Sequence, residues 1–158
     1  MKTTITRILT TTALLLAMSH SFAADTTPST PAAPDTLTPV RAQIAAKNWS
    51  GAISELKRVN ETGSADWNNL MGYSLRKAKS PDYEGAEKFY NEALRIDPKH
   101  RGALEYSGEL YLMLGDLAKA EQRLAVLDKV CNFGCEEYTD LKKAVAAYKA
   151  NGNRYVPR

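Results

Sequence analysis

The sequence predicts an all-α protein built from a repeated pair of helices, preceded by an export signal. Three observations predict this fold class. No stretch shows the alternating pattern of a strand, two long stretches repeat the same order of small and large residues, and one further helical stretch follows them.

The first residues are typical of a secretory signal peptide. Lys2 and Arg7 precede an apolar run over 8–18, and a small-x-small cleavage site ends at Ala23. The apolar run is about half of the roughly 20 residues that a spanning helix needs, so a retained anchor is the weaker alternative. We expect removal of residues 1–23, a periplasmic or secreted protein, and no stable membrane insertion afterwards.

Composition and charge argue against several classes of function. The formal net charge of the whole chain is +3, and it falls to +1 when Lys2 and Arg7 leave with the signal peptide. A near-neutral surface argues against a nucleic-acid partner. His100 is then the only histidine, whereas catalytic triads and many metal sites depend on imidazole. We expect no enzymatic activity, no cofactor and no metal.

Residues 24–38 are predicted to form a disordered linker. They contain three prolines and several threonines, and Leu37 is their only sizeable hydrophobic residue. Such a segment cannot bury enough apolar surface to offset the entropy lost on ordering. The folded domain is therefore predicted to span 39–158, a length within the usual range for one domain.

Breaking and capping residues set the bounds of the predicted helices. Pro39 opens the first helix, where its missing N–H is not needed. Pro98 ends the fourth because it cannot continue a helix, and Gly152 stops the last. The helices are predicted at about 39–47, 49–60, 65–78, 82–96, 100–114, 116–130 and 136–150.

Two stretches, residues 71–98 and 107–131, carry the same pattern. In both, a glycine is followed by a large residue, an aspartate, a small alanine and a second large residue. Glycine and alanine let two antiparallel helices approach closely, and the large residues fill the gaps beside them. The matched positions are Gly72 and Gly108, Leu75 and Tyr111, Asp82 and Asp116, Ala86 and Ala120, and Tyr90 and Leu124.

This pattern resembles the tetratricopeptide repeat, a helix-turn-helix unit of about 34 residues. With an earlier partial copy over 48–59, the resemblance covers nearly all of 39–158. It implies a short α-solenoid of about three tetratricopeptide-like helical hairpins plus a C-terminal capping helix at 136–150. Repeat two departs from the pattern in two ways: its turn at 78–82 is longer, and Trp67 stands one position early.

Proteins that resemble such arrays hold other proteins or peptides in a concave groove lined by the first helix of each repeat. We therefore interpret the chain as a non-catalytic exported adaptor or scaffold for an unidentified protein or peptide. The alternatives are a structural module that self-associates, and a thiol-redox protein. Carried over by register, the groove positions are Asn69, Tyr73, Arg76, Lys77, Glu105, Glu109 and Leu112.

The charged groove positions are expected to be solvated, as exposed charges usually are. If they bind a partner, reversing the charges of Arg76 and Glu109 together should abolish capture. The melting temperature should then stay nearly unchanged, because exposed side chains contribute little to stability.

The chain has two cysteines, Cys131 and Cys135, at the predicted junction between the sixth and seventh helices. A turn that contains glycine can bring them within disulfide distance, and an oxidising compartment favours the bond. A redox centre would normally show a C-x-x-C spacing in a βαβ context. A metal site would need further ligands. The sequence favours a structural disulfide, with the redox and metal sites as alternatives.

Overall fold

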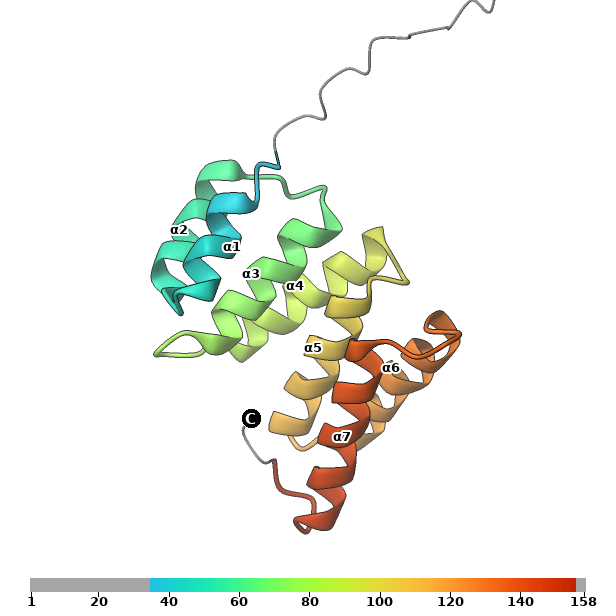
Figure 1. Ribbon diagram of the computed structural model, residues 1–158. Coiled ribbons are helices and arrows are strands. Elements are labelled where there is room, and N and C mark those ends of the chain that lie inside the picture. Colours follow the sequence, from blue (N-terminus) through green and yellow to red (C-terminus); the bar gives the residue numbers. More distant parts are fainter. Residues whose placement is uncertain (1–34, 156–158) are drawn as a thin grey trace, which may run out of the picture. The chain divides into compact units, whose positions relative to one another are not determined.

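The computed structural model describes residues 35–155, and this part of the chain is helical throughout with no strand (Figure 1). The predicted helix bounds are confirmed to within one or two residues. The helices are α1 (Thr38–Ala45), α2 (Trp49–Val59), α3 (Ala65–Lys77), α4 (Tyr83–Ile96), α5 (Arg101–Met113), α6 (Leu117–Val130) and α7 (Glu136–Ala150).

The folded part begins earlier than the predicted boundary at residue 38. Leu37, assigned to the linker from the sequence, is only 4% exposed and packs with Val40 and Leu56. Its burial places it in the domain rather than in the predicted linker. The predicted signal peptide and residues 24–34 lie outside the described residues. Between residues 35 and 155, no helix combines the length and apolarity needed to cross a bilayer.

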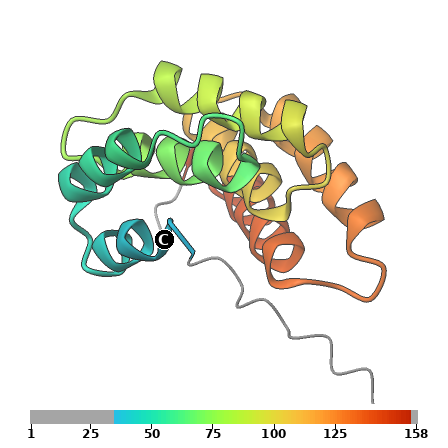
Figure 2. The ribbon, with the colours of Figure 1, turned by 90° about the horizontal axis from the view of Figure 1, so that it is seen from above.

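The helices pack as successive hairpins. α1 packs on α2, α3 on α4 and α5 on α6, while α7 packs against both α5 and α6. Seen from above, α4 and α6 lie on one side of the array, and α3, α5 and α7 lie on the other (Figure 2). The predicted all-α, tetratricopeptide-like arrangement of hairpins with a final capping helix is confirmed.

Side-chain caps explain why the helices start where they do. The first N–H groups of a helix have no partner within it, and a capping side chain can accept from one of them. Pro39 lies in the first turn of α1. In the later helices the capping residues are Asn48, Ser64, Asp82, His100, Asp116 and Cys135, each of which accepts from a backbone N–H three residues on.

The glycines shared by the two repeats lie where helices approach closely. A Cβ at Gly72 would be 2.9 Å from the ring of Tyr90 and 3.1 Å from the carbonyl oxygen of Ala86. A Cβ at Gly108 would be 2.5 Å from a methyl group of Leu141. The absence of a side chain at Gly72 lets α4 pack closely against α3. Its absence at Gly108 lets α7 pack closely against α5.

We expect Gly72→Ala to destabilise the protein more than Gly108→Ala. Overpacking costs about 1–3 kcal/mol, and the better helix propensity of alanine returns up to about 1 kcal/mol. At Gly72 the obstacles are a fully buried ring and a backbone oxygen, whereas at Gly108 they are methyl groups that can rotate. Thermal unfolding of both variants measures the order, and a lower melting temperature for Gly108→Ala would contradict this reading of the two contacts.

Candidate partner-binding surface

The first helices of repeats two and three, α3 and α5, contact each other directly. Most of the predicted groove positions on them are buried, so the expectation that they are solvated is wrong. Arg76 is 3% exposed and Glu109 is 7% exposed, while Lys77 is exposed and Tyr73 half-buried. The other positions, Asn69, Glu105 and Leu112, are also buried.

The buried charges form an ion pair between repeats. Arg76 Nη1 of α3 donates to Glu109 Oε2 of α5 at 2.8 Å, and it lies 3.9 Å from Met113 Sδ. Burial alone lowers the pKa of Arg76, but the nearby Tyr90 and Glu109 outweigh it and raise that pKa above its usual value. The guanidinium therefore stays charged, and a double charge reversal here changes the core as well as the surface.

Aromatic rings surround this ion pair. The rings of Tyr73 and Tyr106 lie 4.6 Å apart between centroids, and the Arg76 guanidinium lies 5.5 Å from the first and 5.6 Å from the second. Cations at such distances are attracted to the ring face. Burial raises the pKa of Tyr106 to about 12 and also raises that of Tyr73, so both phenols are neutral at physiological pH. Two uncharged rings therefore lie beside the Arg76 cation.

Four partly accessible side chains continue from this cluster and form what we call the aromatic face: Trp49, Tyr73, Lys77 and Tyr106. The ring of Trp49 meets that of Tyr73 edge-on at 5.8 Å, and Lys77 Nζ lies 6.0 Å from the same ring. Trp49 also lines a recess of about 450 Å³ that includes Ile53. Tryptophan and tyrosine carry much of the energy of protein interfaces because they are large and amphipathic. The aromatic face is therefore the candidate surface for a peptide side chain.

The groove positions carried over by register do not include Trp49 or Tyr106, which the structure leaves partly accessible. One signal was available: Tyr106 follows Tyr73 at about one repeat length, so the two rings are placed side by side by the array. Trp67 is different. It is buried and packs with Leu56 and Met71.

Asn69 serves the packing of the two repeats rather than an open surface. A Cβ at Gly102 of α5 would lie only 3.1 Å from Asn69 Nδ2, so the amide sits directly against the next repeat. Its buried Oδ1 has no hydrogen-bond partner within the described structure. The groove assignment expected a partner to reach both Asn69 and Leu112. Both are buried, and Leu112 belongs to the C-terminal core cluster.

The one histidine of the folded part has a structural role. His100 Nδ1 accepts from the backbone N–H of Ala103 at 3.1 Å and caps α5, and Nε2 lies 2.9 Å from Asp66 Oδ1. Across residues 35–155, no three or more His, Cys, Asp or Glu side chains gather in a way that could hold a metal ion.

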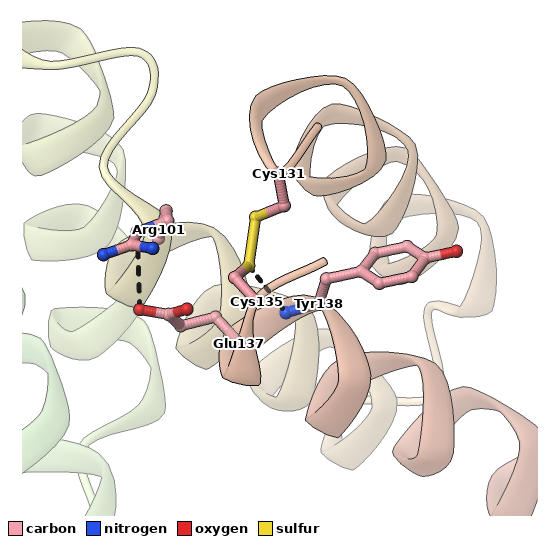
Figure 3. The surroundings of a disulfide bond; sticks show 5 residues. All are labelled: Arg101, Cys131, Cys135, Glu137 and Tyr138. Carbon is pink, nitrogen blue, oxygen red and sulfur yellow. Dashed lines mark hydrogen bonds and ion pairs between the residues drawn. A yellow bond between two sulfur atoms is a disulfide. The ribbon is translucent and has the colours of Figure 1, made fainter. Parts of the chain in front are cut away.

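The two cysteines form a disulfide between the end of α6 and the start of α7, with Cα atoms 5.6 Å apart (Figure 3). Cys135 Sγ accepts from the N–H of Tyr138 at 3.4 Å, so the same residue also caps α7. Nearby, Arg101 of α5 pairs with Glu137 of α7 at 3.5 Å. The entrance of the capping helix is therefore held by a covalent bond and an ion pair.

Replacing Cys131 and Cys135 with serine should lower the free energy of unfolding by about 2 kcal/mol and the melting temperature by several degrees. The capping helix packs on repeat three only, so amide exchange should rise first at Leu141. A matched control is Phe133→Ser inside the same loop, because that ring is fully exposed and its loss should leave stability unchanged. A double serine variant that melts like the parent but loses a thiol-dependent activity would support the redox alternative instead.

The arrangement is that of a helical-repeat protein, in which paired helices stack and each unit is stabilised by its neighbours. Residues 78–147 match the family model of the tetratricopeptide repeat. This match supports a tetratricopeptide repeat protein, as the sequence pattern predicts. A search of curated proteins finds no significant match. Proteins with these repeats generally bind other proteins or peptides and are generally non-catalytic.

Proposed function

We propose that this protein is an exported, non-catalytic adaptor that holds a protein or peptide partner on its aromatic face. The observation that carries the proposal is the set of partly accessible rings of Trp49, Tyr73 and Tyr106 around a buried ion pair. The ion pair fixes the rings in place before binding. A preformed aromatic surface costs less entropy to occupy than a flexible one.

The export part of this proposal rests on the sequence. Residues 1–23 have the charged start, apolar run and small-residue cleavage site of a signal peptide. The disulfide of Cys131 and Cys135 is compatible with it, because such bonds persist in oxidising compartments. We therefore propose a periplasmic or secreted protein that starts at Ala24.

Site-specific photo-crosslinking in the cells that make the protein tests the binding surface. Benzoylphenylalanine in place of Lys77 stands at the edge of the aromatic face, whereas the same group in place of Lys88 stands exposed on α4. We expect a defined adduct from position 77 that disappears when Tyr73 is replaced by alanine. Position 88 should give no such adduct.

The same experiment separates the alternatives. An adduct of twice the mass of the chain at position 77 would favour the self-association module. Equal adducts from positions 77 and 88, both insensitive to Tyr73→Ala, would contradict the aromatic face as the binding surface.

A further inference from the structure

Beyond α7, the described chain turns back over residues 151–155 (Figure 1). Gly152 and Asn153 both have positive φ, at 65° and 59°, which reverses the chain direction. The turn is held by the N–H of Asn153, which donates to Tyr148 O at 2.9 Å, and by Asn151 Nδ2, which donates to Arg154 O at 3.3 Å. These bonds aim the following residue, Tyr155, back at the array.

Tyr155 packs on the array rather than pointing into solvent. Its ring is half-buried against the core cluster that includes Leu112 and Tyr148. Its phenol also lies close enough to the Arg76 guanidinium to raise the pKa of that group. Leu112 belongs to α5, so the ring packs against one of the two helices that form the predicted groove.

The burial of Arg76 depends on the side chains that surround it. A residue at a groove position of an open array points toward solvent, yet Arg76 is 3% exposed. Tyr73 and Tyr106 cover it on one side, and Glu109 pairs with it. Tyr155, which comes from the other end of the domain, acts on the same guanidinium.

We propose that Tyr155 is an intramolecular occupant of the binding surface, and that the partner displaces it with an aromatic side chain of its own. This inference rests on the proposed function and names the chemistry of the partner: a peptide segment that presents a tyrosine or a similar ring beside Arg76. In the free protein the chain's own residue fills that place. Partner binding is then linked to the release of the tail, residues 151–155.

The contacts are suited to release. Release of this segment breaks the hydrogen bonds of one turn and the packing of Tyr155, and it leaves the helix–helix contacts in place. A tethered ring nevertheless competes at an effective concentration in the millimolar range. The apparent affinity of a partner equals its intrinsic affinity multiplied by the fraction of molecules in which Tyr155 has left this position.

The dye anilinonaphthalene sulfonate, an aromatic anion, probes the uncovered place in the full chain. We expect several-fold more dye fluorescence from Tyr155→Ala than from the parent, because removal of the ring exposes aromatic surface beside a cation. Tyr155→Phe is the matched control and should behave like the parent, since it keeps the ring. Helical content and melting temperature should be nearly equal in all three.

A synthetic peptide of residues 151–155 gives the second readout. It should displace the dye from Tyr155→Ala, and the same peptide with alanine in place of its tyrosine should not. Equal dye fluorescence in the parent and Tyr155→Ala would overturn the inference, as would a fluorescence increase that the tyrosine peptide cannot reverse. Either result leaves the adduct expected at position 77 unaffected, so failure of this inference is distinguishable from failure of the proposed function.

Discussion

Replacing Glu109 with alanine is expected to lower the free energy of unfolding by about 3–5 kcal/mol, because it leaves the Arg76 guanidinium buried without its carboxylate. The two groups lie 2.8 Å apart, and their side chains are 2% and 10% exposed. Neither has enough contact with water to recover its solvation. Urea denaturation followed by circular dichroism measures the loss.

Two comparisons make this prediction specific. Replacing both partners, Arg76→Met with Glu109→Leu, should restore much of the stability, because a buried ion pair exchanged for apolar residues of similar size is often neutral or stabilising. Glu84→Ala removes an exposed pair with Lys88 and should cause no measurable loss. If Glu109→Ala behaved like Glu84→Ala, the buried ion pair would not be a structural link between the repeats.

Replacing Trp67 with alanine is expected to cost about 3–5 kcal/mol, the usual range for a buried tryptophan. The ring is 4% exposed, and it meets Phe89 edge-on at 5.8 Å. Its Nε1–H donates to the carbonyl oxygen of Leu56 at 2.8 Å, which ties α2 to α3. The loss should therefore appear first as faster amide exchange in α1 and α2.

Trp67→Phe and Trp49→Ala are the controls for this prediction. The first keeps a ring and loses only the hydrogen bond to Leu56, so it should cost about 0.5–1.5 kcal/mol. The second removes a half-buried ring on the aromatic face and should reduce stability less than Trp67→Ala. A larger loss from Trp49→Ala would show that the N-terminal hairpin is held mainly at the aromatic face.

The order and bounds of the helices could be predicted from the sequence because their signals are local. A capping side chain acts on the N–H three residues on, so Asp82 and Asp116 mark helix starts directly. The repeat pattern then fixed which helices pair. Gly72 faces Tyr90 as the pattern requires, since both positions belong to one hairpin.

The burial of the groove positions could not be predicted in the same way. Register gives the side of a helix on which a residue lies, but burial depends on what the neighbouring repeats place over it. Arg76 is a charged residue, and such residues are usually exposed to solvent. In the structure, the facing Glu109 and the rings of Tyr73 and Tyr106 bury it. Tyr155 lies still further along the chain, and no local pattern relates it to α3.

Hydrogen exchange, measured on the free protein and on its complex with the protein captured from position 77, tests the central claim most directly. We expect slower exchange in α3 and α5, over 65–77 and 101–113, and faster exchange at 151–155 as the tail is released. Exchange in α4 and α6 should not change. Protection confined to 83–96 and 117–130 would contradict the account, because it would place the partner on the opposite side of the array.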